Sequence, residues 1–453
     1  MVKLWNQESA QWRVELQADG EALSQRMGEQ PRQLLVSLGE EAVTAERLRQ
    51  AAAQAVKTVR DFGAESAVLD AAAAVEALGA EGLGALAQGA GLALYRQEAW
   101  KERKDQPFTL YVAGAGALDA QAVLDEAAAL VRAVCFARDL VNCPANKLTP
   151  MDMAARMTEE AQKVGIETQV LDEEQTRALG MEAFLTVGTS ATHPARLIVL
   201  RWKGGKEGEA PIALVGKGVT CDTGGYCLKT PAGLKGTRGD MAGGAAVCAA
   251  VLALAANKVP VNAVAVIPAV ENRLSADSFI PGDVIGSMSG KTIEVGNTDA
   301  EGRLILADAV TYAIQQEKAA RVVDIATLTG AVVAALGFTT AGLLTNDEAF
   351  YAQLQEAAQR AGEQYWRLPD FPEYKKMIES PVADISNVSS DGCGAITAGL
   401  FVGAFAGDTP WIHLDIAGTA WVDSPRRAYQ AKGATGAGAA TLYQLCRGLA
   451  QEG

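Results

Sequence analysis

Short β-branched runs alternate with longer runs of small apolar residues through the second two thirds of the chain. The expected elements are helix 151–164, strand 167–170, helix 173–180, strands 196–202 and 212–215, helix 241–256, and strands 262–268, 321–326 and 411–416. Such alternation predicts a mostly parallel central sheet with helices on both faces. Residues 280–296 are expected to form a hairpin that leaves this sheet.

The first part of the chain predicts a smaller α/β domain. Its expected strands are 33–37, 66–69 and 108–113, and its expected helices are 42–62, 71–97 and 120–140. Two prolines in NCPANKLTP, residues 142–150, interrupt the helical pattern and indicate an interdomain segment. We therefore expect an N-terminal domain over 1–141 and a larger C-terminal domain over 151–453.

Composition narrows the classes of function. The chain has 453 residues and a net charge of −14, which argues against general binding to nucleic acid or to anionic membranes. The N-terminus lacks the apolar core of a signal peptide, and the apolar run 243–256 is too short to span a bilayer. Seven cysteines without a CxxC pair are typical of reduced thiols, so we expect a cytoplasmic protein.

Charged residues interrupt a glycine-rich stretch, VGKGVTCDTGGYCLKTPAGLKGTRGDMAGG, which spans residues 215–244. Lys217 and Asp222 follow the expected strand 212–215, and Lys229 and Asp240 precede the expected helix 241–256. Ligands of α/β proteins bind beyond the carboxyl ends of strands, where such turns lie. Solvated loop charges are the bland alternative for any one of these residues.

A second stretch, NTDAEGRLIL at residues 297–306, strengthens the case for a ligand site. Asp299, Glu301 and Arg303 alternate, so an extended segment would point all three side chains to one side. Two neighbouring carboxylates repel each other unless a proton or a cation lies between them. With Asp222 and Asp240 they make an oxygen-rich set that suits divalent ions such as Mg²⁺, Mn²⁺ or Zn²⁺. Bridging carboxylates could hold two such ions.

Other catalytic motifs fit poorly. GSMSGKT, residues 286–292, has three residues between its glycines where a P-loop needs four, and it precedes a strand. The chain has two histidines and no HExxH motif, so a histidine-rich zinc site is excluded. We expect His193 in a loop and His413 as a core imidazole. No GxSxG elbow occurs, which argues against a serine hydrolase.

The motifs together resemble those of the leucyl aminopeptidases, peptidase family M17. NTDAEGRL at 297–304 is similar to the family signature, and VGKGVTCDTGG with Lys229 and Asp240 is similar to its first metal motif. RDLVNCPANKLTP at 138–150 resembles the interdomain segment, and DIATLTGA at 324–331 resembles the loop after the metal site. The resemblance covers the C-terminal domain, whereas the N-terminal part is similar only in size and α/β character.

The resemblance implies a metalloaminopeptidase, an EC 3.4.11 hydrolase that removes the N-terminal residue from peptides with a free amine. It implies two divalent metal ions per subunit, Mn or Zn with Mg or Co as further options, and a bicarbonate. Asp222 and Glu301 would bridge the ions. Lys217, neutral once a metal lowers its pKa, and Asp240 would complete one site, and Asp299 the other. Lys229 would stabilise the oxyanion, and Arg303 would hold the bicarbonate that acts as general base.

The resemblance also places Thr327, Leu328 and Gly330 at the substrate and implies a homohexamer. Cys221 and Thr223 replace the usual Phe and Ser beside Asp222. Thr237 stands where many relatives have a pocket methionine, which would make the substrate pocket more polar. Two other hypotheses stay open. One is a noncatalytic regulator, since some relatives bind DNA, and the other is a phosphotransferase that uses residues 286–292.

Overall fold

The chain forms two compact units. The computed structural model describes residues 2–4, 10–17, 23–26, 32–39, 41–97, 107–389 and 391–452. Met1–Cys135 and Val422–Gly433 make the first unit, and Phe136–Trp421 and Ala434–Gly453 make the second. The predicted boundary near residue 141 lies at the end of α3 (Ala120–Asn142), and the return of residues 422–433 to the first unit was not predicted.

The first unit contains a six-stranded sheet with helices. The strands follow the order β1 (Val2–Leu4), β6 (Thr109–Ala113), β5 (Ser66–Asp70), β2 (Trp12–Gln17), β4 (Arg32–Ser37) and β3 (Leu23–Arg26). All neighbours are parallel except β3 and β4. α1 (Ala45–Asp61) and α2 (Ala72–Ala93) pack together, and α2 kinks at Gly79, where φ is 58°.

The segment 422–433 completes the core of the first unit. The Tyr429 ring is buried in the same apolar cluster as the helices, and its hydroxyl donates to the Glu46 carboxylate on α1 at 3.1 Å. The Ala428 amide donates to Gln50 Oε1 at 2.6 Å. Residues more than 370 positions apart in sequence therefore belong to one packing unit.

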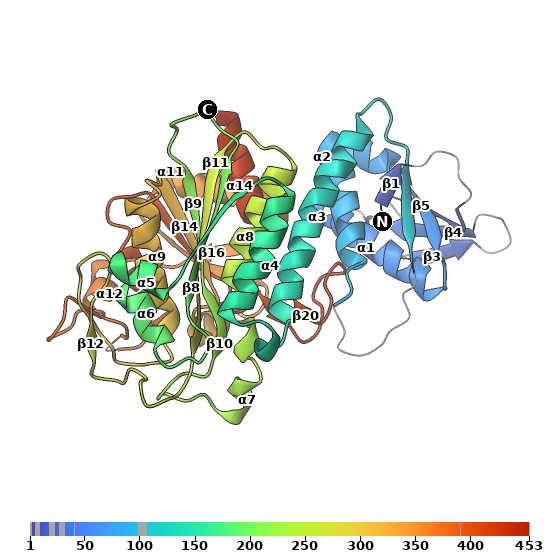
Figure 1. Ribbon diagram of the computed structural model, residues 1–453. Coiled ribbons are helices and arrows are strands. Elements are labelled where there is room, and N and C mark those ends of the chain that lie inside the picture. Colours follow the sequence, from blue (N-terminus) through green and yellow to red (C-terminus); the bar gives the residue numbers. More distant parts are fainter. Residues whose placement is uncertain are drawn as a thin grey trace. The chain divides into compact units, whose positions relative to one another are not determined.

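The second unit is built on a nine-stranded sheet (Figure 1). Its order is β16 (Gln364–Arg367), β15 (Thr340–Thr345), β18 (Trp411–Asp415), β14 (Arg321–Ala326), β9 (Ile212–Gly216), β11 (Asn262–Asn272), β8 (Arg196–Lys203) and β7 (Glu167–Leu171), with β10 (Gly218–Asp222) paired to β11. The central strands are parallel, and antiparallel pairs join β15 to β18, β11 to β8 and β8 to β7. The predicted mostly parallel sheet is confirmed.

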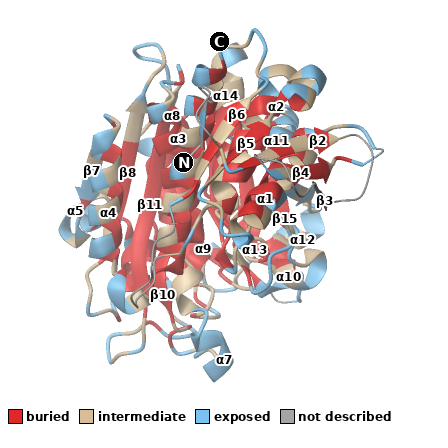
Figure 2. Ribbon diagram, turned by 90° about the vertical axis from the view of Figure 1, so that its right-hand side faces the viewer, coloured by how far each residue is buried: buried red, intermediate tan, exposed pale blue. Residues whose placement is uncertain are grey.

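Helices cover both faces of this sheet (Figure 1). One face carries α4 (Pro150–Lys163), α8 (Ala242–Ala256), α11 (Glu348–Ala361) and α14 (Ala439–Glu452), and the other carries α6 (Glu182–Gly188), α9 (Glu301–Gln315) and α13 (Gly394–Gly403). Figure 2 shows the central strands in the colour of buried residues. The stretch Thr237–Ala256 has the length and hydropathy of a membrane span, but 83% of its apolar window is buried inside the fold, as in a core helix.

The remaining elements are short. They are α5 (Glu173–Ala178), α7 (Pro231–Leu234), α10 (Gly330–Leu336), α12 (Pro372–Lys376), two 3₁₀ turns (Ala145–Lys147 and Thr237–Gly239), β12 (Val284–Ile285), β13 (Ile293–Glu294), β17 (Ile385–Ser386), β19 (Trp421–Val422) and β20 (Gly433–Ala434). The antiparallel pair of β12 and β13 confirms the predicted hairpin. The predicted helix 173–180 ends early because Gly180 turns the chain with φ of 77°, and α6 follows.

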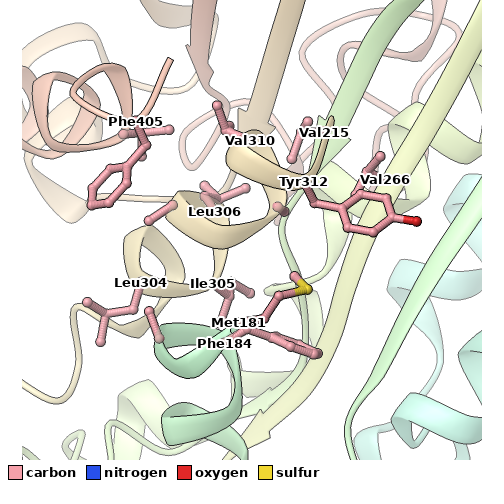
Figure 3. Packing of buried hydrophobic residues seen from close by; sticks show 14 of the residues in the cluster. Met181, Phe184, Val215, Val266, Leu304, Ile305, Leu306, Val310, Tyr312 and Phe405 are labelled. Atoms are coloured by element: carbon pink, nitrogen blue, oxygen red, sulfur yellow. The ribbon is translucent and has the colours of Figure 1, made fainter. Parts of the chain in front are cut away.

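Close packing fixes helix α9. Leu304, Ile305 and Leu306 are fully buried on this helix, and they pack with Met181 and Phe184 near α6 (Figure 3). The extended conformation predicted for 299–303 is wrong, because α9 already begins at Glu301. An acidic side chain is favourable in the first turn of a helix, where amides point outward and the macrodipole is positive.

Candidate metal centre

The predicted ligand residues meet at the carboxyl ends of the central parallel strands. Lys217 directly follows β9, Asp222 is the last residue of β10, and Thr327 follows β14. Asp240 precedes α8, and Glu301 opens α9. The two glycine-rich stretches, more than fifty residues apart in sequence, therefore contribute to one site.

Lys217 lies at the centre of an inner cluster. Its Nζ is 2.7 Å from Asp240 Oδ2 and 2.9 Å from Glu301 Oε1, and it donates to the Thr327 carbonyl at 3.1 Å. Only 4% of the Lys217 side chain and 1% of the Glu301 side chain are exposed. Gly302 makes this approach possible, because a Cβ there would lie 2.5 Å from Lys217 Cε.

Lys229 lies at the centre of an outer cluster. Its Nζ is 2.6 Å from Asp222 Oδ2 and also contacts Asp299 Oδ1. About a quarter of the Lys229 side chain (24%) and a third of Asp299 (32%) remain exposed. The other Asp222 oxygen, Oδ1, accepts from the Gly224 amide at 3.0 Å and from Asn272 Nδ2 at 2.9 Å. Protein donors therefore hold one Asp222 oxygen and leave the other directed at the site.

Burial and charge oppose each other at these groups. Burial and the nearby Asp222 carboxylate together raise the pKa of Glu301 to about 8, against the pull of Lys217. Burial likewise raises the pKa of Asp240 to about 6 against the same ammonium. Burial acts to lower the pKa of Lys217, but Asp240, Glu301 and Asp222 outweigh it and raise that pKa above its usual value. Crowded carboxylates thus need positive charge to ionise together.

The arrangement fits divalent metal ions. Carboxylate oxygens of Asp222, Asp299 and Glu301 lie within 4.8 Å of one another. Glu301 Oε2 is buried and has no hydrogen-bond partner among the described residues. An oxygen-rich set with an unsatisfied buried carboxylate oxygen is what Mg²⁺, Mn²⁺ or Zn²⁺ requires. The two lysines provide the positive charge that lets four carboxylates stay in one place.

A cavity of about 530 Å³ opens onto both clusters. Lys217, Asp222, Lys229, Asp240, Asp299 and Arg303 all line it. Arg303 is 8% exposed, and its guanidinium donates through Nη1 to the Asn387 carbonyl at 2.7 Å. Its Nε has no hydrogen-bond partner among the described residues, and burial lowers its pKa to about 10. A buried cation with an unused donor beside a cavity suits a small anion.

The loop after β14 forms another wall of the cavity. Thr327, Leu328 and Gly330, which the family resemblance placed at the substrate, line it, and the Thr327 hydroxyl donates to Asp240 Oδ1 at 2.8 Å. Asp415 at the end of β18 accepts from the Leu328 amide and from the Thr329 hydroxyl. Asp415 was not predicted, although an acid at the end of an apolar strand was a usable signal.

Thr237 is the predicted pocket residue that lies apart from the others. Its side chain hydrogen-bonds to that of Cys221, and it is not among the residues that line the cavity. Thr223, which also departs from the family pattern, donates its hydroxyl to the Asn272 carbonyl at 2.9 Å. Thr223 therefore helps to fix the backbone that follows Asp222.

The two histidines have their own carboxylate partners. His413 is 1% exposed in β18, and its Nδ1 lies 2.6 Å from Asp324 Oδ1, as expected of a core imidazole. His193 lies 3.0 Å from the buried carboxylate of Glu271. The stretch 286–292 forms the turn of the β12–β13 hairpin, where the Ser287 hydroxyl donates to the Lys291 carbonyl at 2.8 Å. No helix follows it, so it lacks the geometry of a P-loop.

Comparisons with known proteins agree over almost the whole chain. The catalytic domain of the cytosol aminopeptidase family matches residues 135–443, and the N-terminal domain of that family matches residues 22–104. The chain is 43% identical over 422 residues to a probable cytosol aminopeptidase of Clostridium perfringens, covering 91% of this chain and 85% of the relative. A probable cytosol aminopeptidase of Alkaliphilus metalliredigens is 43% identical over 426 residues, covering 92% and 85%.

Solved structures give the same result. The bottromycin maturation enzyme BotP in complex with Mn superposes with a TM-score of 0.90 at 33% identity, covering 98% of this chain and 100% of that chain. A point mutant of tomato leucine aminopeptidase superposes with a TM-score of 0.88 at 30% identity, covering 98% and 95%. Both likenesses extend through the two units described above.

The fold and the carboxylate-lined cavity define a metal-dependent hydrolase of the α/β class. The chain belongs to the M17 cytosol aminopeptidase family, and it is therefore a metal-dependent aminopeptidase of the EC 3.4.11 class that acts on peptides.

Proposed function

We propose that the protein removes the N-terminal residue of peptides with a free α-amine by using two divalent ions per subunit. The observation that carries this proposal is the gathering of four carboxylates and two lysines, of which all but the buried Glu301 line one cavity. When bound, a pair of divalent ions lowers the pKa of water and polarises the scissile carbonyl. Mn or Zn is the proposed pair, with Mg or Co as alternatives, and BotP was solved with Mn.

Asp222 and Glu301 are the proposed shared ligands. Each contributes a buried carboxylate, and oxygens of the two lie within 4.8 Å of each other and of Asp299. Lys217 and Asp240, on the inner side, would complete one ion's ligand set, and Asp299 on the outer side would complete the other. As a ligand Lys217 must first lose its proton, so its raised pKa sets a cost that only a dication can offset.

Lys229 is the proposed stabiliser of the oxyanion. Its ammonium lines the cavity and keeps partial exposure, so a substrate oxygen can reach it without rearrangement of the core. Its pKa is raised, because Asp222 and Asp299 outweigh burial, so it stays protonated at neutral pH. A fixed ammonium lowers the barrier to carbonyl attack by matching the charge that develops there.

Arg303 is the proposed holder of a bicarbonate. The Asn387 carbonyl fixes one arm of the guanidinium, while Nε stays free among the described residues to bind an anion. A bicarbonate held there would accept the proton of the attacking water as general base. Without such an anion, Arg303 would be a buried cation whose Nε has no hydrogen-bond partner among the described residues.

The wall formed by Thr327, Leu328 and Gly330 is the proposed contact for the substrate backbone and first side chain. Thr237 stays a proposed specificity residue, although its side chain bonds to Cys221. We further propose a homohexamer, as the family resemblance implies, and a cytoplasmic location, in line with the family name. The net charge of −14 argues against nucleic acid as a partner. A sedimentation mass near one chain's 47.3 kDa in an active preparation would contradict the hexamer.

Chelation followed by metal analysis tests the proposal. Exhaustive dialysis against a chelator should abolish hydrolysis of aminoacyl amides, and adding back Mn, Zn, Co or Mg singly should restore it to different extents. A matched substrate with an acetylated amine should stay intact under every condition. Activity that survives with no metal bound would exclude the two-metal hypothesis. A gel-shift assay with DNA tests the hypothesis of a noncatalytic regulator, and an ATP-binding measurement tests that of a phosphotransferase. We expect no binding in either assay.

A further inference from the structure

Asn387 is a buried residue that no sequence motif singled out, yet it touches both functional parts of the 296–303 segment. It directly follows β17, whose parallel pairing with β13 continues when the Asn387 amide donates to the Glu294 carbonyl at 3.0 Å. Its side chain is fully buried. The next residue, Val388, lines the cavity. Asn387 therefore lies where the hairpin meets the metal centre.

The Asn387 amide uses its whole hydrogen-bonding capacity on one loop. Oδ1 accepts from the Gly296 amide at 2.7 Å and from the Asn297 amide at 3.3 Å. Nδ2 donates to the Asn297 carbonyl at 2.8 Å and to the Ala300 carbonyl at 3.3 Å. Two donors and two accepting positions are all that a carboxamide offers. The side chain therefore holds the 296–300 loop at both ends in a single orientation.

The same residue also orients Arg303. The Asn387 main-chain carbonyl accepts from Arg303 Nη1 at 2.7 Å, and this bond ties the guanidinium to the described part of the chain. Asp299 lies in sequence between the turn bound by the Asn387 side chain and Arg303, and its amide donates to Asn297 Oδ1 at 2.8 Å. Asp299 and Arg303 lie four residues apart, yet both are fixed through a residue more than eighty positions away.

We propose that Asn387 is a positioning residue that sets the Asp299 carboxylate and the Arg303 guanidinium at a fixed separation, a role that rests on the functions proposed above for those two groups. The side chain holds the turn that carries Asp299, and the carbonyl holds the arm of Arg303. Residues that support metal ligands in this way typically contribute 10–100-fold in metal affinity or activity. Asn387 itself reaches neither metal nor substrate.

Asn387→Ala tests the role, because it removes four hydrogen bonds and leaves the main-chain carbonyl. We expect the Kd for Mn²⁺, measured by titration calorimetry on metal-free protein, to rise by roughly 10–100-fold for the ion completed by Asp299. With saturating Mn²⁺, kcat should fall while KM changes little, because the loosened 296–300 turn no longer keeps Asp299 at a fixed separation from Arg303.

Asn262→Ala is the matched control. That amide also binds backbone, at Gly205, Lys206 and Glu209, but at the opposite end of β11 from the metal centre. It should lower the melting temperature and leave Mn²⁺ affinity and kcat unchanged. A purely structural role for Asn387 would make the two variants behave alike, and this result would overturn the proposal.

The result must also be separated from failure of the underlying roles. If Asp299→Ala loses Mn²⁺ and Arg303→Ala loses kcat while Asn387→Ala matches wild type, the positioning role is wrong. If Asp299→Ala and Arg303→Ala are themselves silent, the proposed ligand and anion roles are wrong and the positioning role falls with them. Should Asn387→Ala not fold, Asn387→Ser decides by the same criteria, since it keeps a polar side chain without added charge but is too short to make the four hydrogen bonds of the carboxamide.

Discussion

The inner and outer lysine clusters each contain one lysine and two carboxylates but differ in their exposure. Lys217 with Asp240 and Glu301 lies almost entirely inside the protein. In the outer cluster Asp222 is also buried, but the Lys229 and Asp299 side chains are 24% and 32% exposed. Burial raises the pKa of Glu301 to about 8. The two lysines are chemically identical, so burial alone makes Lys217 suited to hold a metal and Lys229 suited to contact a substrate.

Removing the buried carboxylate should have the largest effect. Glu301→Ala takes away a proposed shared ligand and leaves Lys217 with one fewer partner, so both ions should bind weakly. We expect activity to fall by well over about 10²-fold, the upper range for losing a mere supporting residue. Metal content after dialysis, measured by mass spectrometry, should fall in parallel. A variant that keeps both metals would show that Glu301 is not a shared ligand.

Lys229→Ala should separate the outer cluster from the inner one. The ammonium meets charge that appears only during the reaction, so its loss should lower kcat by about 10²–10³-fold and change KM little. Metal content should stay at the wild-type level, in contrast to Glu301→Ala. If Lys229→Ala instead loses metal and keeps its activity per bound metal, the roles of the two lysines are reversed.

Arg303→Ala should be milder. The cavity stays open, so free bicarbonate can still enter, and adding it should recover part of the lost kcat. The comparison is made at constant pH and ionic strength, with chloride as the control anion. A loss that bicarbonate does not reduce at all would argue against the proposed general base.

Acid should weaken metal binding through the inner cluster first. Before metal binds, the pKa of Glu301 is about 8 and that of Asp240 about 6, so Glu301 is largely protonated at pH 7. Metal binding at pH 7 should therefore release about one proton from Glu301, and about two if Lys217 is also a ligand. Calorimetry in buffers of different ionisation enthalpy counts these protons. If no proton were released, the raised pKa of Glu301 would be contradicted.

The same raised pKa values affect the metal-free fold. A carboxyl whose pKa is higher in the folded than in the unfolded state binds its proton more tightly when folded. The stability that Glu301 adds is therefore present in acid and is lost as pH rises from its unfolded value of 4.5 to about 8. Metal-free protein should melt at a lower temperature at pH 8 than at pH 6, and Glu301→Gln should reduce the difference.

Local pattern and motif predicted most of the fold and the charged residues of the site. Apolar runs located β9, β11 and β14, and NTDAEGRL identified Asp299, Glu301 and Arg303, because such signals are contiguous in sequence. Alternation gave the wrong conformation for 299–303, since period two and the first turn of a helix look alike over five residues. Asn387 was missed because its partners are more than eighty residues away and an ordinary polar residue carries no local signal. Asp415 could have been found from its place at the end of the apolar strand β18.

The return of residues 422–433 to the first unit bears on how the protein is made. The core around Tyr429 and the amide contacts of Gln50 are incomplete until that segment exists. Domains that are contiguous in sequence fold as units while synthesis proceeds, the N-terminal one first. Here the small unit also needs Val422–Gly433, and the ribosome makes this segment only after Phe136–Trp421 of the second unit. The small unit therefore cannot complete its core before most of the catalytic unit has been synthesised.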